Sequence, residues 1–297
     1  MRKLSTEKRA AILASLVEGV SVNATSRING VSKITVLRLL VDVGTFCGRY
    51  HDQHVRNLQT SRIEMDEVWG FCGCKEKQKQ KGGLGLGDVW LWVGLDADSK
   101  LVASYRVGDR SKRTGAPFVA DLASRLAGRV QITSDAHNVY LRAVAQAFNG
   151  QVDYARLVKI YAAPADGIRN YSPPECIGAK REIISGDPDP DLISTSYVER
   201  QNLTVRMGMK RLSRLTNAHS RSMRNHEAAI NLHYWHYNFA RKHSTVKTTP
   251  AVAAGIAPKA LTLLDLVEMV ERDEQFRGGR ITGYLPSPPS NESRSAG

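Results

Sequence analysis

The order of strand-like and helix-like segments in the middle of the chain constrains its fold more than any other feature. Residues 62–73 alternate between polar and apolar side chains, which is typical of a strand. Residues 87–109 do the same on both sides of a turn at Asp96–Lys100, which predicts two further strands. Strands are also predicted at 129–140 and 152–162, and amphipathic helices at 114–128 and 141–150.

This β-β-β-α-β-α-β order, followed by another helix, predicts a mixed α/β fold that begins with an antiparallel meander. It is the order of the RNase H-like fold, so we expect a five-stranded mixed sheet flanked by helices. We assign residues 61–256 to this domain, including an irregular insertion at 166–194 that is rich in Pro, Gly and Asp. Residues 257–297 are predicted to form a C-terminal helix and, after Phe276, a disordered tail.

The N-terminal part of the chain, residues 1–60, has a helical pattern instead. Residues 4–43 predict three short helices, the first with Ser5 as its N-cap and the second ended by Asn29-Gly30. The third begins at Ser32, and its first turns carry the polar residues Ser32, Lys33, Thr35 and Arg38. A short helix, a turn with Gly30 and a Ser-capped helix are typical of a helix-turn-helix DNA-binding domain. The alternative is a three-helix packing module with no role in DNA binding.

The charge of the chain favours a nucleic-acid partner. The net charge is +13 and the pI is near 9.7. The excess is clustered, because Arg200–Pro250 holds ten Lys or Arg residues against a single acid, Glu227. Such a cluster indicates binding to a polyanion. The lysine run Lys75–Lys81 is a second candidate for DNA contact, or alternatively a solvated loop.

Targeting and redox features are sparse. The sequence has neither a secretory apolar region nor a run of eighteen apolar residues, so we expect a cytoplasmic protein with no membrane partner. The four cysteines are then expected to be reduced, and Cys72 and Cys74 lack a second pair at zinc-finger spacing.

Three acids lie where the predicted topology would bring them together. Asp66 is in the first strand, Asp135 is at the end of the fourth, and Glu199 is in the first turn of the helix after the fifth. Converging carboxylates repel one another, and a divalent cation removes that cost. Hard oxygen ligands suit Mg²⁺ or Mn²⁺, and two such ions are the expected cofactors of in-line displacement at a phosphodiester.

Each acid also has a simpler interpretation. Glu64 and Glu67 compete with Asp66, although only Glu64 shares its strand face. Asp135 fits the role of a helix cap, and Glu199 fits an ion pair with a basic residue of its own helix. On residue patterns alone, these alternatives stay open.

Several stretches resemble bacterial insertion-sequence transposases, in particular the insertion-sequence-one-like group of the DDE superfamily. They are EMDEVWGFCGCKEKQKQK, SDAHNVY, YVERQNLTVRM with the following RLSR, and HEAAINLHYWHYNFARKHSTVKTTPAVAAGI, and together they span residues 62–256. The resemblance implies that Asp66, Asp135 and Glu199 bind the metal and that Arg206 contacts DNA phosphate. It further implies Mg²⁺-dependent cleavage at inverted-repeat ends and joining of the 3′-hydroxyl to target DNA. The cysteine-rich zinc module that often opens members of this group is missing here.

The expected partner is therefore double-stranded DNA, both as transposon ends and as target, in the bacterial nucleoid. On the cationic helix and its continuation we expect phosphate contacts from Arg200, Arg206, Lys210 and Arg211, and near the N-terminus base contacts from Ser32, Lys33, Thr35 and Arg38. Pairing of two ends implies a homo-oligomer on DNA, and no small-molecule substrate is expected. The competing hypotheses are an RNase H-like nuclease or resolvase that only hydrolyses, and a non-catalytic DNA-binding protein derived from a transposase.

Overall fold

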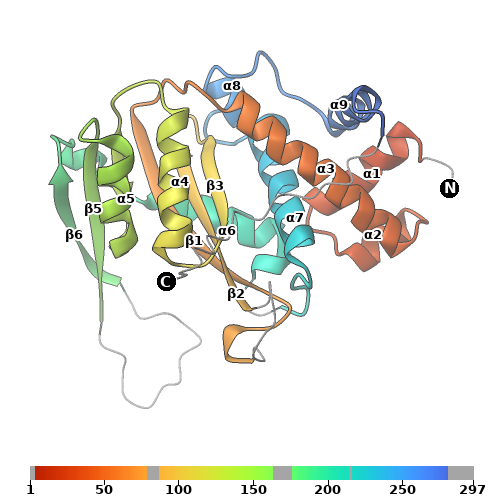
Figure 1. Ribbon diagram of the computed structural model, residues 1–297, viewed down its shortest axis with the longest axis horizontal. Coiled ribbons are helices and arrows are strands. Elements are labelled where there is room, and N and C mark those ends of the chain that lie inside the picture. Colours follow the sequence, from red (N-terminus) through yellow and green to blue (C-terminus); the bar gives the residue numbers. More distant parts are fainter. Residues whose placement is uncertain (1–3, 79–86, 163–175, 214–215, 280–297) are drawn as a thin grey trace, which may run out of the picture.

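The computed structural model describes residues 4–78, 87–162, 176–213 and 216–279. Within these ranges a six-stranded mixed sheet forms the centre of the protein, in the order β3-β2-β1-β4-β5-β6 (Figure 1). The strands are β1 (Arg62–Cys72), β2 (Gly87–Asp96), β3 (Val102–Gly108), β4 (Gln131–Ser134), β5 (Asp153–Tyr161) and β6 (Cys176–Ser185).

The longer helices of the described residues are α1 (Thr6–Val17), α2 (Val22–Ile28), α3 (Lys33–His54), α4 (Lys112–Arg125), α5 (Asn138–Phe148), α6 (Ser196–Gly208), α7 (Met223–Trp235) and α9 (Leu263–Phe276). The short elements are α8 (Pro250–Ala253), the 3₁₀ turns η1 (Glu76–Gln78), η2 (Pro190–Leu192) and η3 (Lys210–Leu212), and a π-helical turn, η4 (His236–Ala240).

The first five strands follow the predicted order along the chain, and the first three form the predicted antiparallel meander. β1 pairs antiparallel with β2, and β2 with β3, while β4 is parallel to both β1 and β5. This confirms a mixed α/β sheet that begins with an antiparallel meander, which is the strand arrangement expected of an RNase H-like fold.

The prediction of five strands was wrong. β6 lies inside the segment predicted to be irregular and pairs antiparallel with β5, from Tyr154↔Ser185 to Tyr161↔Cys176. Its side chains are exposed or half-buried along its whole length. An edge strand that buries neither face has no need of apolar alternation, so its sequence carries no strand signal.

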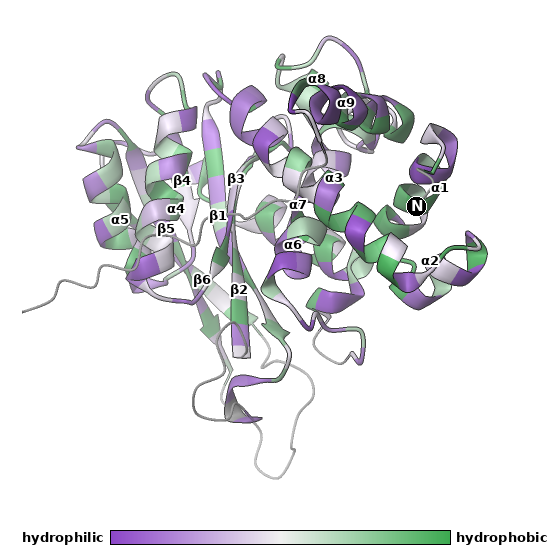
Figure 2. Cartoon of the chain, turned by 45° about the vertical axis from the view of Figure 1, so that its right-hand side comes forward, coloured by the Kyte–Doolittle hydropathy of each residue, from purple (hydrophilic) through white to green (hydrophobic). Residues whose placement is uncertain are grey.

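Two layers of helices cover the sheet. On β2, Leu91, Val93 and Leu95 pack with α6 and α7, whereas Trp92 points to the other face and packs with α4 and α5. This alternation of period two lets one strand bury both faces. Figure 2 shows the covering helices with both hydrophobic and hydrophilic stretches, as helices packed on one side require.

The N-terminal helices have the predicted caps. The Ser5 and Ser32 side chains accept hydrogen bonds from the backbone amides of Lys8 and Thr35. The third helix is longer than predicted, however, because Gly44 does not end it. A Cβ on Gly44 would lie 2.2 Å from the Ala228 carbonyl oxygen, so this glycine permits close packing of α3 on α7. One buried apolar cluster runs from Ile12 through the sheet to Val270.

The C-terminal helix α9 returns to the N-terminal helices. Arg9 of α1 is buried and bonds to Glu271 at 2.9 Å and Glu274 at 3.3 Å. Residues 280–297, where a disordered tail was predicted, lie outside the described residues. So do residues 163–175, which include 166–175 of the predicted insertion, residues 79–86, which include 79–81 of the lysine run, and Arg214. Across the described ranges, none of the helices combines the length and the apolar character needed to cross a membrane.

Candidate metal centre on the central strands

Strand register brings two of the predicted acids together. The parallel pairing of β1 with β4 runs to Met65↔Ser134, so Asp66 is the next residue of β1 and Asp135 is the first residue after β4. Parallel strands lie about 4.8 Å apart, which places both carboxyl groups within reach of one cation. Carboxylate oxygens of Asp66, Glu67 and Asp135 all lie within 4.8 Å of one another.

Glu67 is the member of this group that the sequence pattern did not favour. It lies on the opposite strand face from Asp66, is buried, and has Oε1 3.3 Å from His137 Nδ1 and Oε2 3.3 Å from Arg110 Nη2. It still reaches Asp135 because that residue follows the end of β4, where the backbone has left the sheet. The alternation of side chains between the two faces of a strand is therefore not sufficient to predict which carboxylates meet where a strand ends.

Neighbouring carboxylates raise the pKa values of Asp66 and Asp135. Burial, and then the charges of Asp135 and Glu67, raise the pKa of Asp66 to about 7. Burial and then the Glu67 charge also raise the pKa of Asp135, while Arg110, whose Nη2 lies 3.8 Å from its Oδ2, opposes that change. Acids crowded in this way bind a cation favourably, because the cation replaces repulsion with attraction.

Helix α6 contacts Asp66 through one side chain, but its Glu199 side chain bonds to other residues. Asn202 Nδ2 donates a hydrogen bond of 2.8 Å to Asp66 Oδ2. One turn earlier, Glu199 Oε1 accepts from Lys159 Nζ of β5 at 2.5 Å and from the Thr195 hydroxyl. The structure thus brings Asp66 and Asp135 together, and holds Glu199 beside them on a lysine ammonium rather than inside the carboxylate cluster.

A buried glutamate sets the position of α6. Glu64 Oε2 accepts from the backbone amides of Tyr197 (2.8 Å) and Val198 (2.9 Å), and so caps the helix from a neighbouring strand. Thr195, at the N-cap position, makes no side-chain cap bond. Burial raises the pKa of Glu64 to about 7, although these two backbone bonds lower it. Glu64 thereby fixes the helix that carries Asn202 and Glu199.

Sequence patterns missed the cations of the site. Lys159 and Arg110 come from different elements, and only the fold brings them to Glu199 and Glu67. Lys159 occupies a strand that alternates weakly, so nothing marked it as inward-facing. The role of Glu64 could have been anticipated in part, because Glu64 lies on the same strand face as Asp66, and α6 packs on that face.

The predicted DNA-binding residues come from two parts of the chain, α6 with η3 and the start of α3. Arg200 and Lys210 are exposed, and Arg206 is half-buried. Arg211 turns inward, where its Nη1 donates to Ser220 Oγ at 2.9 Å and to the Asn225 carbonyl at 3.1 Å. At the start of α3, Lys33 and Arg38 are exposed, whereas Ser32 and Thr35 bond to each other as part of the helix cap.

The donor set suits a divalent cation. It consists of hard carboxylate oxygens, some of them buried, with no cysteine or neutral histidine required. Oxygen-only sites of this kind favour Mg²⁺ or Mn²⁺ over softer metals. The residues present therefore fit a metal centre of the type expected from the sequence.

Neither a family profile nor a curated protein sequence matches the chain. Among solved structures, a match is the cryo-EM structure of a piggyBac transposase synaptic complex with hairpin DNA. The two share 12% sequence identity over 96% of this chain and 75% of that chain, with a TM-score of 0.38. At this distance the similarity assigns neither a family nor an activity.

Proposed function

We propose that the protein is a DNA transposase of the DDE type, which cuts DNA at inverted-repeat ends and joins the 3′-hydroxyl to a target. The observation that carries this proposal is the meeting of Asp66, in β1, with Asp135, which directly follows the adjacent parallel strand β4. Glu199 and Asn202 lie beside them on a helix whose continuation is strongly cationic. A metal-binding acid cluster next to a basic surface suits phosphodiester chemistry on DNA.

The chain's own residues have separable roles in this proposal. Asp66 and Asp135 are the principal ligands, and Glu199 is the third acid once it leaves Lys159. Asn202 orients the Asp66 carboxylate, and Glu67 adds negative charge from behind. Two Mg²⁺ or Mn²⁺ ions, when bound, supply activation of the attacking hydroxyl and stabilisation of the leaving oxygen.

DNA binding is divided between two groups of residues. Residues 1–60 act as the helix-turn-helix domain, with Ser32, Lys33, Thr35 and Arg38 at the start of α3 facing base edges. The basic residues of α6 and η3, namely Arg200, Arg206, Lys210 and Arg211, bind phosphates. Coordinated cutting of two ends requires two active sites, so the protein works as a homo-oligomer on DNA.

A strand-transfer assay tests the proposal. Linear DNA carrying the inverted repeats that flank the gene is incubated with Mg²⁺ and a supercoiled target, and joined products are sought. We expect joining by the wild type, and a loss of at least about 10³-fold in Asp135→Asn with DNA binding retained. Products that are only hydrolysed would identify a nuclease or resolvase instead, and unchanged cutting by Asp135→Asn would remove the acid cluster from catalysis.

The two groups of DNA-binding residues are separated by a second pair of variants. Arg38→Ala should relax preference for the inverted repeat over unrelated DNA, because it removes a base-edge contact worth about 1–3 kcal/mol. Arg206→Ala should weaken both DNAs equally and reduce the dependence of affinity on salt. If Arg38→Ala keeps the full preference, α3 is not the element that reads the sequence.

A further inference from the structure

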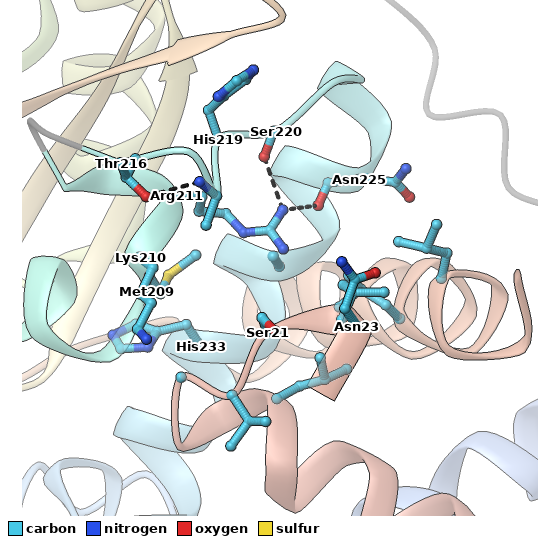
Figure 3. A pocket seen from close by; sticks show the side chains of 18 of the residues that line it. Ser21, Asn23, Met209, Lys210, Arg211, Thr216, His219, Ser220, Asn225 and His233 are labelled. Atoms are coloured by element: carbon cyan, nitrogen blue, oxygen red, sulfur yellow. Dashed lines mark hydrogen bonds between the residues drawn. The ribbon is translucent and has the colours of Figure 1, made fainter. Parts of the chain in front are cut away.

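A large cavity lies between the N-terminal helices and the segment that joins α6 to α7. It has a volume of about 770 Å³ and opens among residues of α1, α2, α3, η3 and α7 (Figure 3). Ligand-binding cavities in proteins typically have volumes of about 300–1,000 Å³, so this one is large enough for a nucleotide unit. It is separate from the carboxylate cluster, with which it shares no residue.

The charge of the cavity is one-sided. Four basic residues line it, Lys33, Lys210, Arg211 and Arg221, and none of the described residues in its lining is acidic. Among the described residues, the Arg211 guanidinium donates hydrogen bonds to two neutral acceptors, the Ser220 hydroxyl and the Asn225 carbonyl, and to no carboxylate. Burial lowers the pKa of Arg211 to about 10. A cation withdrawn from water without a carboxylate partner is costly, and a bound anion removes that cost.

His233 gives an independent sign that the cavity receives a ligand. Its side chain is 5% exposed, it lines the cavity beside Met209 and Lys210, and neither ring nitrogen has a hydrogen-bond partner among the described residues (Figure 3). Burial lowers the pKa of His233 to about 3, so the ring is neutral and carries one N–H donor. A buried donor without an acceptor destabilises the protein until an acceptor arrives.

We propose that this cavity binds a phosphate group, anchored by Arg211 and the flanking Lys33, Lys210 and Arg221, with His233 supplying a neutral donor. Guanidinium and ammonium groups together with one neutral donor match the several acceptor oxygens of a phosphate. The phosphate belongs either to a DNA strand or to a free nucleotide. The first source rests on the proposed function, with Lys33 holding a phosphate instead of a base edge, whereas the second does not.

A second hollow favours a strand as the source. It has a volume of about 570 Å³, lies along α3 and the start of α7, and shares Leu37 and Asn225 with the first cavity. Arg38 and Arg224 line it, together with the acid Asp42. Successive phosphates of a strand that leaves the cavity would therefore meet further cations along the path towards the start of α3.

The experiment measures binding of a fluorescent decathymidylate by anisotropy, with thymidine 5′-phosphate and pyrophosphate as competitors. The variant Lys33→Gln/Lys210→Gln/Arg221→Gln is compared with a matched control, Lys112→Gln/Lys180→Gln/Lys259→Gln, whose three lysines are exposed elsewhere. We expect at least a tenfold loss in the cavity variant, a salt slope smaller by about 2, and little change in the control. Competition by the small phosphates at micromolar concentration identifies a free nucleotide as the source, and its absence identifies a strand.

His233→Phe separates binding from folding. We expect it to weaken decathymidylate binding about fivefold, as for one lost hydrogen bond, while the melting temperature stays the same or rises. A falling melting temperature with unchanged affinity would give the ring a structural role only. If this variant and the cavity variant both bind like the wild type, the proposal is wrong.

Failure of this proposal is distinguishable from failure of the proposed function. If the variants bind decathymidylate like the wild type and Mg²⁺-dependent joining persists, the cavity proposal is wrong and the transposase proposal stands. If the cavity binds phosphate but the protein never cuts DNA, the transposase proposal is wrong and the cavity proposal stands.

Discussion

The carboxylate cluster on the central strands and the basic cavity by the N-terminal helices differ in how their buried charges are compensated. At the cluster, built-in cations lie close to the acids: Lys159 holds Glu199, and Arg110 lies near Glu67 and Asp135. In the cavity, the described hydrogen-bond acceptors of Arg211 are neutral, and no described lining residue is acidic.

The difference indicates how each region meets its ligand. At the cluster, an incoming metal ion competes with ammonium and guanidinium groups, so its binding also rearranges the protein's own ion pairs. In the cavity, an incoming anion displaces no charged side chain and simply compensates an existing excess. We therefore expect substitution of the cations at the cluster to change its affinity for a metal ion. In the cavity, we expect stability to depend mainly on whether an anion is bound.

The largest expected effect is on the pH dependence of stability without metal. Asp66 has a pKa raised from 3.8 to about 7 in the folded protein, so folding binds a proton between these values. The stabilisation is complete below pH 3.8 and is lost as pH rises through about 7. In EDTA, the free energy of unfolding should fall by about 1–3 kcal/mol more between pH 5 and pH 8 in the wild type than in Asp66→Asn. If denaturant titrations give the same change in the free energy of unfolding between pH 5 and pH 8 for both proteins, the cluster does not raise the pKa of Asp66.

Opposite ligands should stabilise the two regions independently. At ten times their dissociation constants, Mg²⁺ and pyrophosphate, added separately, should each stabilise the protein by about 1.4 kcal/mol. Thermal melts should lose the Mg²⁺ effect in Asp66→Asn only, and the pyrophosphate effect in Lys33→Gln/Lys210→Gln/Arg221→Gln only. Loss of both effects in one variant would mean that the regions are not separate sites.

Removal of the α6 cap is expected to cost less. Glu64→Ala deletes the acceptor for the Tyr197 and Val198 amides, and the free energy of unfolding at pH 8 should fall by about 1 kcal/mol. Glu268→Ala, an exposed glutamate on α9, serves as the control. A loss no larger than the control's would show that Glu64 does not position α6.

The smallest expected effect tests competition at the cluster. Lys159→Met frees the Glu199 carboxylate, so calorimetry should show Mn²⁺ binding tightened about fivefold, with a stability loss below about 1 kcal/mol. Lys180→Met, on the edge strand β6, should leave Mn²⁺ affinity unchanged. Weaker binding in Lys159→Met would mean that the lysine supports the metal site instead of competing with it.

The sequence predicted the parts of the molecule that repeat local rules. Alternation located β1, β2, β3 and β5, and the serine caps located the starts of α1 and α3. Alternation also located β4, but the strand predicted at 129–140 ends at Ser134, and residues 138–140 belong to α5. Prediction from the sequence failed where tertiary contacts decide. Gly44 has the signature of a helix end but serves close helix packing, and β6 buries no face and so shows no alternation.

The candidate site shows the same division. Strand order placed Asp66 and Asp135 near each other, as the register of β1 and β4 confirms, but only the resemblance to transposases favoured Asp66 over Glu64 and Glu67. The roles of Glu64, Glu67 and Lys159 depend on which side chains of other elements arrive beside them. No local sequence pattern predicts these contacts. It therefore could not predict that Glu64 caps a helix while Glu67 joins the cluster.

The central claim is that Asp66, Asp135 and the adjacent acids hold the divalent ions of the reaction. Fe²⁺ with ascorbate and peroxide cuts the backbone next to a bound metal, and mass spectrometry locates the cuts. We predict cuts beside residues 66, 135 and 199 that are suppressed by excess Mg²⁺ and absent in Asp66→Asn. Cuts elsewhere that Mg²⁺ suppresses equally well, with none near these strands, would contradict the account.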